Sequence, residues 1–584
     1  MYNSQCPFSI IEATASGNCF GYDLTDMGCA QVSALMSNTK FESELKRWNT
    51  PSRFPKPILI NAPTGAGKTH FVRTELAEFA QKQGRSILFL SNRRALNMQT
   101  REILSKSNES PAFSSDALNT IIRYGNLVVG TYHSIDTILS KLQNDPIQQT
   151  LPIGYVVLDE IHFLASDALF NAQTRHIFTK ILNAFPSCQR IYLSATPQEV
   201  RDIIACEEYR LYHWYIHQNN YTYLPALSNP IKNISEYLFQ ADYSYINLHF
   251  CDSLDDLVPK MKASKDKWLI FVSKKSDGES FSDTLNKKLG VAAFYVDADK
   301  RNSSPEIRRK LGIIIEHEKF KEKALIATSL LDNGINFHDP EVKNIVVDSV
   351  DPIQIKQMIG RKRLDASETI KVYIVKHNQK EIQSYLKDAR TKVTLLNYYR
   401  QNPQQFIQEK FFNLTEAERG LFQPTHNPYS QNFTLVVNGY AQYKLACMIH
   451  HYEHLDGLLE MEGEGALERE IAGWFGIEDG NWNNIEEVFA EIQKQALAII
   501  NQYKLAPAET DSEELKNLDR QLWDLVQPIV DKYKIKHDTE SVGKGENIRK
   551  IMQALGLPYD IKKSQGTWYI KDKEAPEIPL NDQP

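Results

Sequence analysis

The feature of the sequence that most constrains the fold is the stretch APTGAGKT at residues 62–69. It fits the pattern G/A-x-x-x-x-G-K-S/T and lies between the apolar run PILIN and the helix-compatible run HFVRTELAEFAQKQG. A strand, a glycine-rich loop and a helix in this order form a phosphate-binding loop, because backbone N–H groups at Gly65 and Gly67 approach phosphate oxygens and the helix directs its positive end at them. The stretch therefore predicts an α/β fold that binds a nucleoside triphosphate.

Within this loop, we expect Lys68 to reach the β- and γ-phosphates and Thr69 to hold Mg²⁺. The loop residues expected to contact the nucleotide are Thr64, Gly65, Ala66, Gly67, Lys68 and Thr69. Kinases, GTPases, transporters and helicases all use such a loop, so it predicts the class of ligand and leaves the reaction open.

A second motif, GYVVLDEIHFL at residues 154–164, places two acids after an apolar strand. Strand-end acids of this kind lie at the carboxyl edge of a parallel sheet, beside the phosphate-binding loop. We expect Asp159 to hold Mg²⁺ through water and Glu160 to orient and deprotonate an attacking water. Because a kinase needs no such base, the motif favours a hydrolase.

Apolar runs recur along the chain in two series separated by helix-like segments. The first series lies near residues 57–61, 86–91, 127–131, 154–158 and 190–194, and the second near 268–273, 292–296, 324–328, 344–348 and 370–375. Strands alternating with helices predict a parallel sheet covered on both faces. The sequence therefore predicts two tandem lobes that face each other across one nucleotide.

Two further motifs, LSATP at residues 193–197 and QMIGRKR at residues 357–363, complete an ordered set. The order GAGKT, DEIH, SAT, QxxGRxxR resembles that of superfamily 2 helicases of the DExH type, over roughly residues 55–375. The resemblance implies two RecA-like lobes, ATP and Mg²⁺ as cofactors, and an ATP-dependent helicase that contacts DNA or RNA mainly through the phosphate backbone.

The resemblance also implies roles for single residues. Arg94, in SNRRALNMQ, and Thr131, in VVGTYHS, correspond to contacts with the nucleic-acid backbone. In ATSLLDNGINF, Thr328 corresponds to a further strand contact, and Gly334 with Asn336 to residues that face the nucleotide.

Four other positions connect the nucleotide with the two lobes in this family. Ser194 and Thr196 link the nucleotide state to strand binding, and His162 and Gln357 join the lobes across the nucleotide.

The last motif departs from the family pattern Q-x-x-G-R-x-x-R. Arg361 fits the first arginine, but Leu364 stands at the second position and Arg363 lies one residue early. An arginine on the transferring phosphate can raise the rate by about 10³–10⁵. We expect Arg361 to be the main arginine finger and Arg363 to assist it.

The pattern of runs and breaks divides the chain into expected units. These are an N-terminal extension (1–50), two helicase lobes (51–225 and 226–398), a helical accessory domain (399–530), a basic module (531–573) and a disordered proline-rich tail (574–584). The aromatic run at residues 207–225 is interpreted as a β-ribbon with cross-strand pairs or as a surface that stacks on bases, with the ribbon favoured.

The expected module at residues 531–573 holds ten Lys and Arg against six Asp and Glu, whereas the whole chain has a net charge of −6. A helix followed by a hairpin near residues 564–566 resembles a winged helix that contacts duplex nucleic acid; a small packing domain is the alternative. Trp568 at the hairpin is interpreted either as a residue that stacks on the last base pair or as one that packs inside the small domain. The winged-helix interpretation favours DNA over RNA.

The seven cysteines form no CxxC pair, the start of the chain lacks the pattern of a signal peptide, and no apolar run reaches 18 residues. These features predict a cytoplasmic chain with no membrane span. Two other functions stay open: an ATPase that remodels nucleoprotein without separating strands, and an inactive ATPase that serves as a nucleic-acid-binding subunit.

Overall fold

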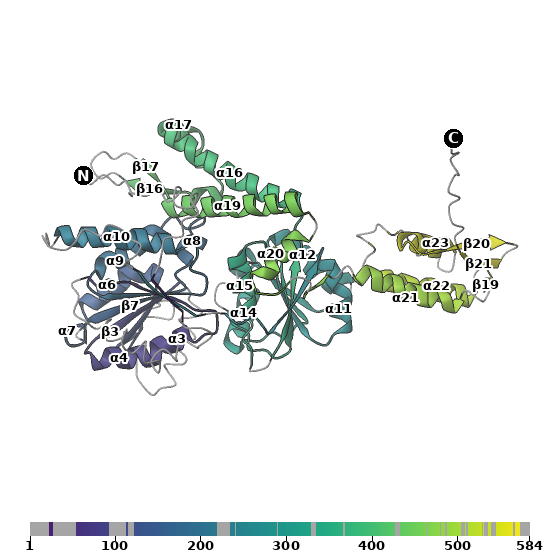
Figure 1. Cartoon of the computed structure of the whole chain (residues 1–584), viewed down its shortest axis with the longest axis horizontal. Helices are drawn as coiled ribbons and strands as arrows, with labels where there is room; N and C mark the ends of the chain where they lie inside the picture. Colours follow the sequence, from purple (N-terminus) through teal and green to yellow (C-terminus); the bar gives the residue numbers. More distant parts are fainter. Residues whose placement is uncertain are drawn as a thin grey trace.

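The computed structural model describes most residues of the chain (Figure 1). These residues are 23–26, 54–92, 113–114, 122–145, 147–218, 234–239, 241–288, 290–328, 335–365, 368–426, 433–463, 465–478, 481–484, 487–503, 508–509, 512–527, 530, 535, 537–538, 545–564 and 567–572. Among these residues, no helix is both long enough and apolar enough to cross a membrane.

The first lobe is built on a nine-stranded sheet of order β1-β9-β2-β8-β7-β3-β6-β5-β4. Its strands are β1 (Asp23–Asp26), β2 (Ile58–Asn61), β3 (Ser86–Ser91), β4 (Phe113–Ser114), β5 (Ile122–Tyr124), β6 (Leu127–Thr131), β7 (Ile153–Asp159), β8 (Gln189–Ser194) and β9 (Ser235–Leu238). All pairs are parallel except those that β5 makes with β4 and β6. The strands β2, β3, β6 and β7 are buried and mostly apolar because helices cover both faces of the sheet.

The helices of the first lobe follow its strands. They are α3 (Lys68–Phe71), the π-helical turn η2 (Val72–Leu76) and α4 (Ala77–Lys82), which form one continuous helix, then η3 (Tyr132–Ser134), α6 (Ile135–Gln143), α7 (Ile147–Thr150), α8 (Phe163–Ser166), α9 (Thr174–Ala184) and α10 (Arg201–Gln218).

The second lobe has a seven-stranded, fully parallel sheet of order β12-β13-β11-β14-β15-β10-β18. Its strands are β10 (Ile246–Cys251), β11 (Lys267–Phe271), β12 (Ala293–Val296), β13 (Ala324–Ala327), β14 (Val342–Val347), β15 (Ile370–Val375) and β18 (Asn483–Asn484). Its helices are η5 (Leu254–Leu257), α11 (Val258–Ala263), α12 (Lys275–Asp283), η6 (Thr284–Lys288), α13 (Ala298–Ser303), α14 (Pro305–His317) and α15 (Pro352–Ile359).

The two predicted parallel-sheet lobes are confirmed, and all ten predicted apolar runs contain strands. The border between the lobes lies further along the chain than residue 225, because β9 pairs with β2 in the first sheet. β10 is the first strand of the second sheet, so the border between the lobes lies after Phe239, which is still in the core of the first lobe, and before Ile246.

The interpretation of the aromatic run as a β-ribbon is wrong. Up to Gln218, the run lies in helix α10, and residues 219–225 fall outside the described part of the chain. The aromatic rings contact one another at helical spacing: the ring centroids of Tyr209 and His213 are 4.2 Å apart, and Tyr212 packs edge-on against Phe54 at 5.2 Å. Contacts between residues four apart on one helix replace the expected cross-strand pairs.

A helical arm, residues 379–473, leaves the second lobe, crosses to the first and returns (Figure 1). It consists of α16 (Gln379–Gln401), α17 (Pro403–Glu409), η7 (Phe411–Asn413), α18 (Glu416–Arg419), the hairpin β16 (Phe422–His426) and β17 (Phe433–Val437), α19 (Gly439–Glu462) and α20 (Ala466–Gly473). Tyr440 and Leu445 of α19 lie in the core of the first lobe, whereas Leu455 lies in the core of the second. A single helix therefore packs into both lobes.

The C-terminal module, residues 487–572, has a core of its own. It consists of α21 (Glu487–Tyr503), β19 (Ala508–Glu509), α22 (Glu513–Val526), α23 (Gly545–Ala554), β20 (Tyr559–Ser564) and β21 (Thr567–Asp572), with the antiparallel sheet order β19-β21-β20. Because α21 and α22 supply part of this core, the folded unit begins well before residue 531. Ser512 caps α22 by accepting a hydrogen bond from the Leu515 N–H at 3.3 Å.

Trp568 packs inside this module. Its side chain is buried, and a Cβ on Gly545 would lie only 2.4 Å from its ring. The close approach explains why a glycine stands at the start of α23, and it leaves no ring face of Trp568 for a base pair. Of the two interpretations given for this tryptophan, internal packing is the one observed.

Candidate nucleotide-binding and catalytic site

The phosphate-binding loop connects β2 to the helix that begins at Lys68. Gly65 and Gly67 have φ angles of +89° and +83°, a region that side chains with a Cβ rarely adopt. The helix that begins at Lys68 continues to Lys82, and its N-terminal end points at the loop. Local geometry therefore requires glycine at both positions and exposes backbone N–H groups where a phosphate would bind.

Lys68 is buried under the loop, where its Nζ donates hydrogen bonds to the carbonyl oxygens of Ala62 (2.8 Å) and Pro63 (3.1 Å). Burial lowers the pKa of Lys68, and the nearby carboxylates of Glu160 and Asp159 act in the opposite direction. The guanidinium groups of Arg363 and Arg361 in the second lobe lower this pKa further, so four charged groups from two motifs act on one ammonium group.

Glu160 follows directly after β7 and is one of two described non-glycine residues with a positive φ, at 52°. Holding a side chain in this region costs about 1–3 kcal/mol, and such strain clusters at functional sites. The Glu160 Oε2 lies 3.3 Å from His162 Nδ1, which is also 3.3 Å from the Ser194 hydroxyl. Behind them, the Tyr132 hydroxyl donates to the Asp159 carbonyl at 2.8 Å. The acidic motif and the SAT motif thus form one connected cluster.

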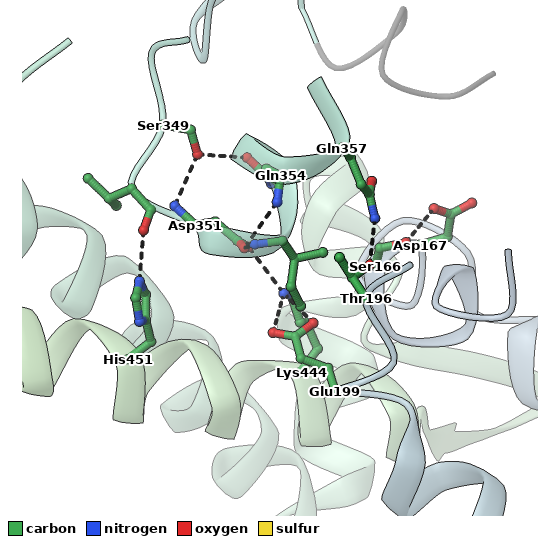
Figure 2. A network of polar contacts seen from close by, with 12 residues as sticks. Ser166, Asp167, Thr196, Glu199, Ser349, Asp351, Gln354, Gln357, Lys444 and His451 are labelled. Carbon is green, nitrogen blue, oxygen red and sulfur yellow. Dashed lines mark hydrogen bonds and ion pairs between the residues drawn. The ribbon is translucent and has the colours of Figure 1, made fainter. Parts of the chain in front are cut away.

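The second lobe meets this cluster through α15 and the turn after it. The Gln357 amide donates a hydrogen bond of 3.0 Å to the Thr196 hydroxyl, which connects the two lobes directly (Figure 2). Three residues later, a Cβ on Gly360 would lie 2.8 Å from the Cβ of Thr64 in the phosphate-binding loop. The lobes are therefore in contact at the loop itself, and only glycine fits there.

The segment after Gly360 explains the unusual arginine spacing. Phe337 pairs with the residues on both sides of Lys362: its N–H donates to the Arg361 carbonyl at 2.8 Å, and its carbonyl accepts from the Arg363 N–H at 2.9 Å. In such an extended pairing, alternate side chains point to opposite sides. Lys362 points away and contacts Glu368 at 3.0 Å, so Arg361 and Arg363 share the other side.

Both arginines face the phosphate-binding loop. Arg361 is buried, and the Nη1 of Arg363 lies 3.2 Å from the position that a Cβ on Gly65 would take. Burial lowers the pKa of Arg363, while Glu160 and then Glu318 raise it. A spacing of two along an extended segment brings both guanidinium groups close enough to act on Lys68.

The remaining residues expected from the sequence lie at the edges of the two sheets or outside the described part. Thr131 ends β6 with its hydroxyl 2.6 Å from that of Ser134, and half-buried Thr328 follows β13. The Oδ1 of Asn336 is buried with no hydrogen-bond partner among the described residues. Arg94 and Gly334 fall outside them.

The residues present fit a nucleoside triphosphate with Mg²⁺. A phosphate would give Lys68 an anionic partner in place of two carbonyls, and a bound donor group would satisfy the Asn336 Oδ1. Thr69 and Asp159 would offer oxygen ligands, which Mg²⁺ prefers.

A second set of residues at the lobe junction was not anticipated from the sequence. Lys444 of α19 lies between Glu199 and Asp351, one from each lobe (Figure 2). The pair Asp351–Pro352 is a recognisable helix start, but nothing in the sequence around Lys444 marks it as a partner.

Comparison with known proteins agrees with the motifs. Residues 31–199 match the family model described as Type III restriction enzyme, res subunit. The chain is 22% identical over 328 residues to the Transcript termination protein A18 of Yaba-like disease virus, which covers 53% of this chain and 64% of that protein. It is 23% identical over 350 residues to the ATP-dependent DNA helicase Hel308 of Thermoplasma volcanium, which covers 52% of this chain and 48% of that protein.

Among solved structures, S. cerevisiae Dbp5 bound to RNA and ADP BeF3 aligns with a TM-score of 0.36 and 16% identity, over 56% of this chain and 81% of that one. The matched part of this chain spans less than two thirds of either curated relative. The family match and the order of the motifs confirm that this chain resembles the superfamily 2 helicases.

Proposed function

We propose that the chain is an ATP-driven motor that moves along nucleic acid and separates its strands. The observation that carries the proposal is the contact between Gly360 of the second lobe and Thr64 of the phosphate-binding loop. That contact brings two arginines from one lobe to the loop, lysine and strand-end acids of the other. The binding of a nucleotide between them would depend on the distance between the lobes, and it would in turn control that distance.

Each residue has a part in this proposal. Lys68 binds the terminal phosphates, Thr69 and Asp159 hold the metal, and Glu160 takes the proton from water. Mg²⁺ supplies charge neutralisation at the phosphates. Arg361, assisted by Arg363, stabilises charge on the transferring phosphate, and Gln357 with His162 connects this chemistry to the lobe contact.

Thr131 and Thr328, with Arg94, are proposed to hold the nucleic-acid backbone at the carboxyl ends of strands in the two lobes. Such contacts are independent of base sequence and weaken with salt. The order of elements in the C-terminal module, helix–strand–helix–helix–strand–strand, supports a winged-helix-like fold and therefore DNA as the substrate. The curated relative named as an ATP-dependent DNA helicase supports the same choice.

The test is ATP turnover measured in parallel with single-stranded DNA, duplex DNA and RNA. We expect single-stranded DNA to stimulate turnover most. Lys68→Ala should abolish hydrolysis because the terminal phosphates lose their cation, and Glu160→Gln should bind ATP yet turn it over slowly because the base is gone. Turnover of Glu160→Gln at the wild-type rate would show that another group activates water.

Two alternatives have distinct outcomes in the same assays. An ATPase that remodels nucleoprotein would hydrolyse ATP on DNA without releasing a strand from a labelled fork. An inactive nucleic-acid-binding subunit would bind DNA without any turnover, which the presence of Lys68, Asp159, Glu160 and Arg361 argues against.

A further inference from the structure

A buried junction of three charged residues connects the two lobes with the helical arm (Figure 2). The Lys444 Nζ, on α19, is 2.7 Å from both carboxylate oxygens of Glu199 in the first lobe and 3.5 Å from the Asp351 Oδ2 in the second. The Lys444 side chain is 8% exposed, and those of Glu199 and Asp351 are 19% and 18% exposed. No one lobe supplies the whole cluster.

Each acid is directly coupled to a motif of the candidate catalytic site. Glu199 stands three residues after Thr196, which accepts the hydrogen bond from Gln357. Asp351 caps α15, because its Oδ1 accepts from the backbone N–H groups of Ile353 (2.8 Å) and Gln354 (3.3 Å). α15 carries Gln357 and leads into the arginine segment. Because a helix is rigid, the position of the first turn of α15, at Asp351, sets the position of its last turn, which carries Gln357.

α19 is held by hydrogen bonds to both lobes, so Lys444 is not a mobile surface cation. On one side, the hydroxyls of Tyr440 and Tyr443 donate to Glu207 and Asp202 of α10, each at 3.0 Å. On the other, His451 lies 2.8 Å from the Val350 carbonyl, next to Asp351. The arm therefore presents Lys444 at a position defined by contacts with both lobes.

The charges make the junction sensitive to the loss of its lysine. Burial alone would lower the pKa of Lys444, but Asp351 and Glu199 outweigh it and raise that pKa. Burial raises the pKa of Glu199 and Lys444 opposes this, while Lys444 and His451 overcome burial to lower the pKa of Asp351. Without Lys444, two half-buried carboxylates would face each other, which favours separation of the loops that carry them.

Space for such a separation exists beside the junction. A cavity of about 380 Å³ adjoins it and is bounded by Thr196 and Glu199 of the first lobe, Asp351 and Lys356 of the second, and Lys444 of the arm. The three elements are thus in polar contact without being packed solidly against one another.

We infer that Lys444 is a positioning residue for ATP hydrolysis: it holds the loop after the SAT motif against the first turn of α15, and so sets how Gln357 and Arg361 meet the first lobe. The inference rests on the proposed ATPase function. Through Lys444, the helical arm, which lies outside both lobes, takes part in the ATP hydrolysis between them.

The test compares Lys444→Met with Lys267→Met in the full chain. Lys267 is a matched control because it is also largely buried and contacts two carboxylates, Asp339 at 3.0 Å and Glu341 at 2.6 Å, but within the second lobe alone. The measurements are kcat and KM for ATP with saturating single-stranded DNA, and the midpoint of thermal unfolding.

We expect Lys444→Met to lower kcat by about 10- to 100-fold with little change in KM, since small misplacements of catalytic groups have effects of this size. Lys267→Met should lower the melting temperature and leave kcat nearly unchanged, and Lys444→Arg should recover most of the lost kcat. Equal kcat values for the two methionine variants would overturn the inference and make Lys444 a structural brace.

Two other outcomes of this experiment can be distinguished from those above. Should Lys444→Met fail to fold, Glu199→Gln serves instead: it keeps the Lys444–Asp351 pair, is expected to lower kcat, and overturns the inference if kcat is unchanged. A wild-type chain that hydrolyses no ATP would overturn the proposed function and this inference together, whereas equal methionine variants of an active enzyme would overturn only the role of Lys444.

Discussion

Gly360 and Gly65 lie on opposite sides of the lobe contact, and each leaves room for one side chain of the opposite lobe. Thr64 fills the space at Gly360, and the Arg363 guanidinium lies over Gly65. Two missing Cβ atoms therefore set the distance at which the arginine segment approaches the phosphate-binding loop.

Gly360→Ala tests this distance. The added Cβ would meet the Thr64 Cβ at 2.8 Å and must push the arginine segment away from the loop. We expect kcat for ATP to fall by at least about 10-fold, with each lobe still folded. Gly312→Ala is the control, because a Cβ at that position in α14 meets nothing within 4 Å. Comparable kcat values for both variants would mean that the contact is absent in the active state.

Single substitutions of the two arginines address their order of importance. Arg361→Ala should lower kcat by about 10³ with ATP affinity within a few-fold, because a finger acts mainly in the transition state. Arg363→Ala should have a smaller effect. Steady-state kinetics and nucleotide binding measured for both variants check this order. A larger loss for Arg363→Ala would assign the transition-state contact to the arginine that lies over Gly65.

Much of this site was predictable at the level of single residues, because its motifs have fixed spacing along strands and turns. Lys68, Asp159 and Glu160 follow from local pattern alone. The position of Arg361 and Arg363 on one side of their segment could not be predicted in this way, because it depends on the pairing of Lys362 with Phe337. Phe337 lies 25 residues away in the sequence, and nothing in the sequence signals this pairing. The junction at Lys444 was missed for the same reason: its partners come from three separate parts of the chain.

At the scale of elements, strands buried on both faces were found from the sequence and more polar ones were not. β7 reads as a continuous apolar run, whereas β10 reads INLHFC and includes a polar His249. α10 was mistaken for strands because aromatic residues are enriched in strands, although here they pack on a helix. Its contacts with Phe54 are long-range and could not be inferred from the run itself.

His249 gives β10 a pH dependence. It is buried, pairs in register with Tyr373 of β15, and stacks on that ring at a centroid distance of 4.8 Å. Burial, with smaller contributions from Lys260 and Lys371, lowers its pKa from 6.5 to about 4. The unfolded chain therefore takes up the proton first, and the stability that neutral His249 allows is present above about pH 6.5 and is lost as the pH falls toward 4.

His249→Phe should remove this dependence, because phenylalanine can stack on Tyr373 and has no proton to gain. Between pH 7.5 and 4.5, we expect the wild-type second lobe to lose about 2 kcal/mol more unfolding free energy than the variant. Thermal or denaturant unfolding at several pH values measures the difference. His176→Phe, at an exposed position on α9, is the control and should keep the wild-type slope. Parallel slopes for His249→Phe and wild type would contradict the prediction.

At the scale of the whole molecule, the packing defines where the chain can be divided. The core of the C-terminal module joins α21 and α22 to α23 and the hairpin, whereas β18, at residues 483–484, still pairs with β10 of the second lobe. A division at residue 530 would cut through that core, and a division after residue 484 would not.

Truncation after residue 484 should leave DNA-stimulated ATP turnover largely intact, because both lobes and the arm remain. It should weaken binding to a forked DNA and reduce strand separation, with a shallower dependence of affinity on salt, because lysine contacts to phosphates are lost. Fork affinity at several salt concentrations, measured beside turnover, tests both parts. Unchanged fork affinity would make the module a docking piece for another molecule, and a loss of turnover would make it a support for the lobes.

The path of the helical arm has a consequence for synthesis on the ribosome. The first lobe ends at β9, but part of its apolar surface is covered by arm residues between Ala389 and Leu445. Roughly 200 further residues must emerge before that cover is complete, which takes about 10–40 s at 5–20 residues per second. During that interval the nascent first lobe presents an apolar face to its surroundings, so the burial of that face depends on a segment of the chain that is synthesised later.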